Sequence, residues 1–155
     1  MDQAADHAQI LVPPPLVFLG YLVAALVLNW AVPLPIPWMV PARVAGGIAV
    51  LVGLALGGSA VFAMIRRNTS PGPHEPSTVL VTDGPYRFTR NPIYVGFFLI
   101  YIGFGWLAGT IWGLLLSPFL LATVTRAIVE PEEKYLGTKF AAAYSEYSSR
   151  VRRWV

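Results

Sequence analysis

Cysteine is missing from the chain, and charged residues are few. The absence of cysteine from all 155 residues excludes disulfides, a thiolate nucleophile and a cysteine-ligated metal. The two histidines, His7 and His74, are too few for a dedicated zinc site, so we expect no metal. Charged residues make up 12% of the chain and hydrophobic residues 55%, whereas soluble domains carry roughly 25% charged residues. This composition indicates a membrane protein.

Signatures of soluble enzymes and of nucleic-acid binding are absent as well. The net charge of +3 is modest and the basic residues form no stripe with interleaved aromatics, so we expect lipid headgroups, and no nucleic acid, as partners. The sequence contains no P-loop, no H-E-x-x-H, no G-x-S-x-G and no glycine-rich dinucleotide fingerprint after a strand. The N-terminal segment carries acids where a signal peptide has basic residues, which predicts that the first apolar run stays as a membrane anchor.

Four apolar runs predict an all-α membrane protein with four transmembrane helices, in a single domain over residues 1–155. The expected spans lie at about residues 15–32, 42–64, 92–107 and 110–129. The third run is short, because a span needs roughly 20 residues. Asn91 suits the cap of the third helix and Pro92 its first turn.

The basic residues predict how the chain is oriented. Arg43 lies on one side of the four-span arrangement, and the other side collects Arg66, Arg87, Arg90, Arg126, Lys134, Lys139, Arg150, Arg152 and Arg153. Because lysine and arginine concentrate in cytoplasmic segments, both termini are expected to be cytoplasmic, in the cell (inner) membrane. An aromatic belt is expected at the opposite surface, formed by Trp30, Trp38, Trp106 and Trp112.

The tail is predicted to be an amphipathic cytosolic helix at about residues 131–150. Its apolar residues recur at helical spacing and are Leu136, Phe140, Ala143, Tyr147 and Val151. Pro131 is expected to kink or restart the helix after the fourth span.

A polar segment, residues 78–96, reads TVLVTDGPYRFTRNPIYVG, and the pair Glu132-Glu133 follows one apolar hairpin later. Opposite charges gathered at one edge of a membrane protein usually mark a site. The pattern G-x-Y-x-x-x-R-[HN]-P-x-Y-x-G, then a hairpin, E-E and F-x-x-x-Y-x-x-Y, resembles the integral-membrane methyltransferases that include isoprenylcysteine carboxyl methyltransferase and phospholipid methyltransferases. The matching residues, within about residues 78–155, are Gly84, Tyr86, Arg90, Asn91, Pro92, Tyr94, Gly96, Glu132, Glu133, Phe140, Tyr144 and Tyr147.

The resemblance implies an enzyme that transfers a methyl group from S-adenosylmethionine to a lipophilic, membrane-embedded acceptor. That acceptor would be an isoprenylcysteine-like carboxylate, a thiol or a phospholipid amine. The implied catalytic residues are Arg90, Glu132 and, toward the acceptor, Arg126. The implied cofactor contacts come from the strand-like run Thr78, Val79, Leu80 and Val81, and from Tyr86, Asn91, Pro92, Ile93, Tyr94, Glu132 and Glu133. Since adjacent helical residues point about 100° apart, Glu132 is expected to face the cofactor, with Glu133 in a supporting ion pair or backbone cap.

Plainer interpretations stand beside these roles. The two glutamates could compensate a helix dipole, Arg90 could be a juxtamembrane anchor, and Arg126 could be a snorkelling charge, which we weigh equally with a role toward the acceptor. Asn91 cannot act as a general base. The alternative functions are a non-catalytic membrane scaffold and an NADPH-dependent membrane reductase.

Overall fold

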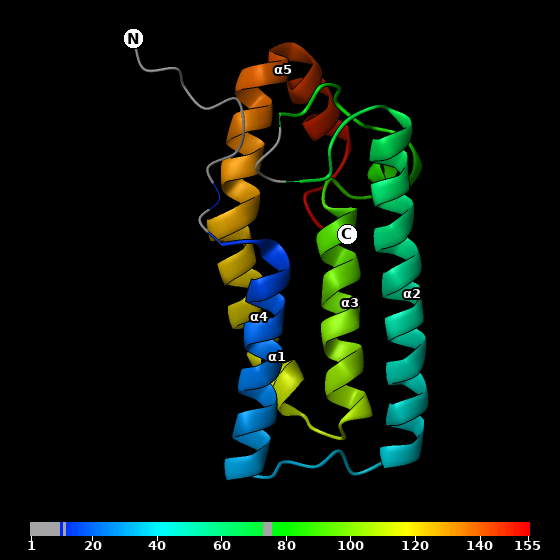
Figure 1. Ribbon diagram of the computed structural model, residues 1–155, viewed down its shortest axis with the longest axis vertical. Helices are drawn as coiled ribbons and strands as arrows, with labels where there is room; N and C mark the ends of the chain where they lie inside the picture. Colours follow the sequence, from blue (N-terminus) through cyan, green and yellow to red (C-terminus); the bar gives the residue numbers. More distant parts are fainter. Residues whose placement is uncertain (1–9, 11, 73–75) are drawn as a thin grey trace.

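The computed structural model describes residue 10, residues 12–72 and residues 76–155, which form helices that stand side by side (Figure 1). In chain order the elements are α1 (Pro14–Ala31), α2 (Met39–Arg66), the 3-10 turn η1 (Gly84–Arg87), α3 (Pro92–Leu107), α4 (Trp112–Val124), the π turn η2 (Thr125–Val129) and α5 (Glu130–Arg150). Within these described residues no β-strand occurs, which confirms the all-α prediction. His7 and His74, on which the expectation about zinc rests, lie outside the described residues.

Three helices are long and apolar enough to cross a membrane: α1, α2 and the continuous helix Trp112–Arg150. The remaining predicted span, α3, is apolar but has 16 residues. At 1.5 Å per residue it is about 24 Å long, less than the roughly 30 Å of a hydrocarbon core. The bounds predicted for the first three spans lie within three residues of the observed helices, but the end predicted for the fourth does not occur and the count of four spans is not confirmed.

The expected restart of the helix at Pro131 is wrong. Helix α4 passes through η2 into α5 without leaving helical conformation, so the fourth predicted span and the predicted cytosolic helix are one helix. In the π turn the Glu130 N–H bonds to the Thr125 carbonyl, five residues back. The hydrogen-bond register has therefore already shifted where Pro131 removes a donor, and the proline is accommodated.

Helix α5 breaks instead at Ala141, where φ is 42° and ψ is −112°. Beyond this residue the chain folds back toward α3, as the red end of the ribbon shows (Figure 1). The break also changes which side chains are covered. Ala143, predicted on the apolar stripe, is exposed, whereas Tyr144 and Tyr147 are buried. The single amphipathic stripe predicted for this tail is therefore not confirmed.

Helices α2 and α3 pack backbone against backbone through glycines. A Cβ atom added at Gly53 would lie 2.6 Å from the carbonyl oxygen of Gly96, and one at Gly46 would lie 2.7 Å from that of Gly103. Such close approach supplies van der Waals contact, which drives helix association where lipid offers no hydrophobic gain. These contacts place Gly96, near the start of α3, beside Gly53 and Gly57 of α2, so the last turns of α2 continue past the start of α3.

The opposite end of the bundle is closed by two connections that bond to each other. The Ile36 N–H donates to the Gly109 carbonyl at 3.1 Å, and the Ile111 N–H donates to the Leu34 carbonyl at 3.1 Å. Trp112 adds a bond from Nε1 to the Val32 carbonyl at 2.8 Å.

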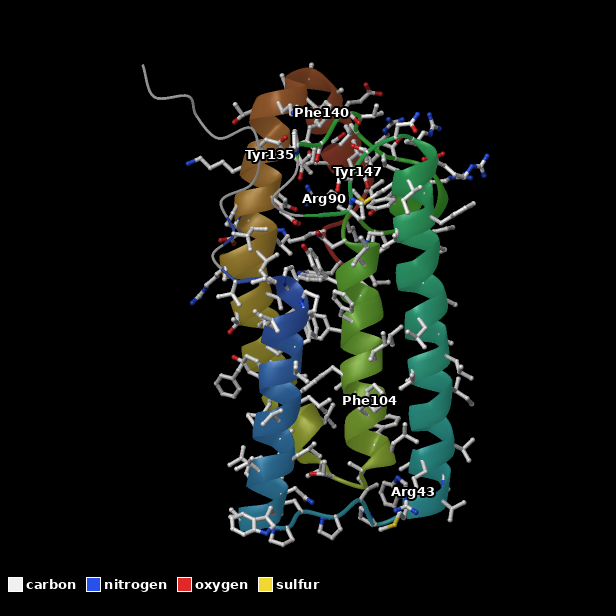
Figure 2. All side chains as sticks on the ribbon, in the orientation of Figure 1. Arg43, Arg90, Phe104, Tyr135, Phe140 and Tyr147 are labelled. Carbon is white, nitrogen blue, oxygen red and sulfur yellow. The ribbon has the colours of Figure 1, made fainter. Side chains whose placement is uncertain are left out.

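The four tryptophans predicted to form a belt sit on the helix ends that meet at this closed end. Figure 2 shows Arg43 at this same end and Arg90 near the other. The sidedness assigned from the charges stays a prediction.

The core lies where α1, α3 and α4 meet, and it includes Phe18, Tyr101, Leu120 and Val124. Large apolar side chains elsewhere point outward, as Leu51 on α2 does with 68% of its surface exposed. Exposed apolar faces along whole helices are what a lipid-facing surface requires. The chain is thus an integral membrane protein whose one polar end carries the candidate site.

Candidate functional site

A cavity opens at the polar end of the bundle, between the last turn of α2, the start of α3 and α5. Figure 2 shows Arg90, Tyr135 and Tyr147 gathered at this end. The cavity is lined by Met64, Ser70, Pro71, Gly72, Ser77, Val79, Leu80, Val81, Tyr86, Arg90, Asn91, Pro92, Ile93, Tyr94, Glu132, Glu133, Tyr135, Leu136, Tyr144 and Tyr147. It therefore brings together two segments that are about 40 residues apart in the sequence, as the contact between Tyr94 and Glu132 illustrates.

Most residues proposed from the sequence line this cavity, but Thr78 and Arg126 do not. The Thr78 hydroxyl donates to the Asn68 carbonyl at 2.7 Å, and its N–H donates to the Thr69 hydroxyl at 2.8 Å, so Thr78 fixes the loop. Residues 78–81 are irregular, not the strand that their apolar run suggested. Arg126 lies on the π turn with its side chain exposed, a position that suits a snorkelling charge.

Glu132 is held in the cavity wall by Tyr94, whose hydroxyl donates to Oε1 at 2.7 Å. Glu132 lies beyond the apolar part of its helix, which ends at Val129. The pKa of its carboxyl is raised to about 7, mainly because burial disfavours the charged form; the Tyr94 hydrogen bond opposes this shift, and the nearby Glu133 adds to it. No ion pair to Glu132 occurs among residues 10, 12–72 and 76–155. The carboxylate faces the cavity without a compensating cation from these residues.

Two arginines, Arg90 and Arg153, compensate the negative charge of the neighbouring Glu133. Arg153 binds it with a fork of bonds, from Nη2 to Oε2 at 2.7 Å and from Nε to both oxygens at 3.1 Å. On the other side Arg90 Nη2 lies 3.2 Å from Oε1. Bonds of this charge-assisted, forked kind are strong and directional. The adjacent carboxylates thus have opposite surroundings: Glu133 is neutralised and Glu132 is not.

Arg90 is held on two of its three nitrogens. Besides the ion pair to Glu133, Nη1 donates to the Tyr144 hydroxyl at 3.3 Å. Its Nε is buried and has no hydrogen-bond partner among the described residues. A buried guanidinium N–H without a hydrogen bond is costly, so this N–H is a candidate donor to a ligand.

Asn91 does not cap α3 as predicted, because its side chain makes no cap hydrogen bond. Its Nδ2 instead donates to the Arg153 carbonyl at 2.8 Å. The Thr89 hydroxyl accepts the Asn91 N–H at 3.1 Å and donates to the same Arg153 carbonyl at 3.1 Å. The start of α3 is therefore tied to the segment that follows α5.

The 3-10 turn η1 forms another wall. Gly84 has a φ of +58°, a left-handed conformation that glycine adopts without strain. The Tyr147 hydroxyl donates to the Tyr86 carbonyl at 2.7 Å, so the last turns of α5 hold this turn in place. Burial raises the pKa values of both tyrosines, which keeps both side chains neutral.

Sequence reasoning assigned no site role to Tyr135, Tyr144, Tyr147 or Arg153. Tyr144 and Tyr147 stood in the recognised pattern, so a signal for them existed. Arg153 had none, since only the fold-back beyond Ala141 brings it to the site.

A model of the phospholipid methyltransferase family matches residues 41–143. Over 73 residues the chain is 37% identical to a protein-S-isoprenylcysteine O-methyltransferase of Schizosaccharomyces pombe, which covers 47% of this chain and 31% of that protein. Over 77 residues it is 38% identical to a protein of the same name from Saccharomyces cerevisiae, which covers 50% and 32%. The alignments thus span about a third of each curated relative. No solved structure matches the chain.

Proposed function

Because the chain belongs to the phospholipid methyltransferase family, we propose that it transfers a methyl group from S-adenosylmethionine to a lipophilic acceptor in the membrane. The observation that carries this proposal is the Glu132 carboxylate, which lies in the cavity wall with no cation partner among the described residues. A buried carboxylate is costly unless it is paired. Such a group favours a cationic ligand.

The residues of the cavity fit this cofactor. S-adenosylmethionine has a sulfonium, an amino-acid end and an adenosine, and when bound it supplies an electrophilic methyl group. Glu132 would hold the cationic part, and the unpaired Nε of Arg90 would bind the cofactor's carboxylate. The apolar wall formed by Val79, Leu80 and Ile93 suits the adenosine.

The chain's own contribution is orientation. Tyr94 holds Glu132, and Arg90 is held by Glu133 and Tyr144, so the charged groups cannot turn away. Fixing donor and acceptor in line can supply much of the rate of a group transfer. Asn91 cannot take a proton, and its side-chain amide is already bonded to the Arg153 carbonyl.

The acceptor is proposed to arrive from the bilayer and the cofactor from the aqueous side, which we assign to the cytoplasm. The cavity adjoins apolar helices on one side and the loop between α2 and α3 on the other. Each partner can therefore stay in its preferred solvent until the two meet. The family name and the names of the relatives favour two acceptor classes, an isoprenylcysteine carboxylate and a phospholipid amine, and a thiol acceptor is the third.

A binding measurement on purified protein in lipid nanodiscs tests this proposal. We expect saturable S-adenosylmethionine binding that Glu132→Gln abolishes, because the amide cannot compensate a cation. Glu146→Gln is the matched control, since Glu146 lies on the same helix, pairs with Arg150 and has 71% of its side chain exposed. Unchanged binding in Glu132→Gln, or NADPH binding in place of S-adenosylmethionine, would overturn the assignment.

The acceptor class is then identified by its product. Membrane lipid extracts and a farnesylated cysteine substrate are incubated with protein and a radiolabelled methyl donor. Label that appears in one of them, and not in the Glu132→Gln reaction, identifies the acceptor class. No label in either substrate refutes both acceptor classes that the relatives favour.

A further inference from the structure

The segment after α5, residues 151–154, bonds back onto the start of α3. The Arg90 N–H donates to the Arg152 carbonyl at 2.9 Å, and the Arg153 carbonyl accepts from Thr89 and Asn91. Trp154 packs edge-on against Phe98, with ring centroids 5.8 Å apart. Backbone bonds and an aromatic contact thus hold this segment, which we call the clasp, against α3.

The clasp places one side chain in the site. Arg153 forks onto Glu133 and reaches Glu130 at 3.7 Å. The Glu133 bond raises the pKa of Arg153, which favours a permanent charge. Glu133 has 16% of its side chain exposed, so solvent screens this pair less than it screens a surface pair.

We propose that Arg153 and Glu133 are positioning residues. The clasp carries Arg153 to Glu133, Arg153 and Arg90 together neutralise that carboxylate, and Glu132 is left as the charge that selects a cation. This proposal rests on the proposed function, since it assigns the ligand-binding charge to one glutamate of the pair.

Neutralisation of Glu133 matters because like charges raise each other's pKa. The titratable groups around Glu132 are Tyr94 from α3, Tyr86 from η1 and Glu133 on its own helix. Of these, Glu133 is the one that forms ion pairs, with Arg90 and Arg153. Without Arg153, the negative charge of Glu133 would act more strongly on Glu132 and would hold a proton there.

The test measures Glu132 directly, by carbon-13 NMR titration of labelled glutamate carboxyls in cofactor-free protein. Arg153→Gln should raise the midpoint of the Glu132 titration and Glu133→Gln should lower it, each by about 0.5–1 pH unit. Arg153→Lys keeps the charge and should restore most of the wild-type midpoint. Arg150→Gln is the control, because it removes the same charge from a side chain that is 70% exposed.

Cofactor binding is measured on the same variants against pH. Below the midpoint, Arg153→Gln should bind S-adenosylmethionine about threefold to tenfold more weakly, and the loss should vanish at higher pH. A loss of equal size at every pH with an unmoved Glu132 midpoint would show a merely structural clasp and refute the proposal. Glu133→Gln binding as poorly as Glu132→Gln would refute it too, because Glu133 would then be a ligand.

The two readouts separate this proposal from the one on function. If S-adenosylmethionine does not bind to wild-type protein, the proposed function fails. Opposite shifts of the Glu132 midpoint in Arg153→Gln and Glu133→Gln would still support the electrostatic role of the clasp. Shifts in the same direction, or none, would overturn that role whether or not the cofactor binds.

Discussion

Replacing Tyr94 by phenylalanine removes one hydroxyl from the site and leaves the ring that packs in the core. The Tyr94 hydroxyl donates to Glu132 Oε1 at 2.7 Å and thereby favours the ionised carboxylate. Burial and, to a smaller extent, Glu133 raise the pKa of Glu132 to about 7 even with this bond in place. Without the opposing bond, the pKa of Glu132 rises further and the carboxylate holds its proton to higher pH.

The size of this effect follows from the hydrogen bond. A bond to a charged group contributes roughly 1.5–3 kcal/mol, and one pKa unit corresponds to about 1.4 kcal/mol. Because Glu132 is accessible from the cavity, water replaces part of the lost bond, and we expect a rise of about one unit. Near neutral pH the ionised fraction then falls from about one half to about one tenth, so the affinity for a cation drops about fivefold.

The assay is S-adenosylmethionine affinity as a function of pH, with wild type and Tyr94→Phe in the same nanodiscs. Below its pKa the ionised fraction of Glu132 falls about tenfold per pH unit, so affinity should rise with pH and level off above the pKa. Tyr94→Phe should shift this curve to higher pH and reach the same plateau. A curve that shifts to lower pH, or a plateau lowered without any shift, would contradict the reasoning, since the hydroxyl would not act through Glu132.

Other predictions concern the packing of α2 on α3, the break in α5 and the exposed side chain of Arg126. Gly53→Ala should lower the free energy of unfolding by about 1–3 kcal/mol in thermal or denaturant unfolding. The added Cβ would meet the Gly96 carbonyl, and neither backbone can move away. Gly47→Ala is the control and should have little effect, because a Cβ there would have nothing within 4 Å. Ala141→Gly should stabilise the protein by up to about 1 kcal/mol in the same assay, because glycine tolerates a φ of 42°; a loss of stability would show that the break is not strained. Arg126→Gln should leave S-adenosylmethionine affinity unchanged in a binding titration, since its exposed side chain lies away from the cavity; a large loss would place it in the cofactor site.

Local signals predicted α3 well and the tail poorly, and the difference has a physical cause. Asn91-Pro92 marks the start of α3 in the sequence, and the helix runs from Pro92 to Leu107 as expected. The break at Ala141 has no such signal, because alanine is the best helix former. The chain beyond it is held by contacts between residues far apart in the sequence, such as the bond from the Tyr147 hydroxyl to the Tyr86 carbonyl, which local signals cannot predict.

Two other predictions were wrong because contacts with the surrounding chain outweighed a local conformational preference. Residues 78–81 were predicted to be strand-like, but no strand occurs in the described part of the chain to pair with them, and Thr69 bonds their backbone instead. Of the kink or restart expected at Pro131, the restart does not occur, because the preceding π turn accommodates the proline. Most of the proposed cavity residues were found through a recognised pattern, whereas Arg153 could be found only from the folded chain.

The cavity itself results from a difference in helix length. Helix α2 has 28 residues and α3 has 16, which correspond to about 42 Å and 24 Å. The two helices run antiparallel with their glycines in register, and they meet at the closed end of the bundle. The last turns of α2 therefore extend beyond the start of α3, and the continuous helix through α4 and α5 does the same on the other side (Figure 1).

Other segments of the chain enclose the cavity beyond the start of α3. The loop between α2 and α3 covers the cavity from one side, and the folded-back end of α5 covers it from the other together with the clasp. The short helix α3 thus gives the cavity its depth, as a cleft does in a soluble enzyme. The base of the cavity therefore lies at the level where the apolar helices begin, and under the proposed function a polar cofactor would reach it from water and a lipid acceptor from the bilayer.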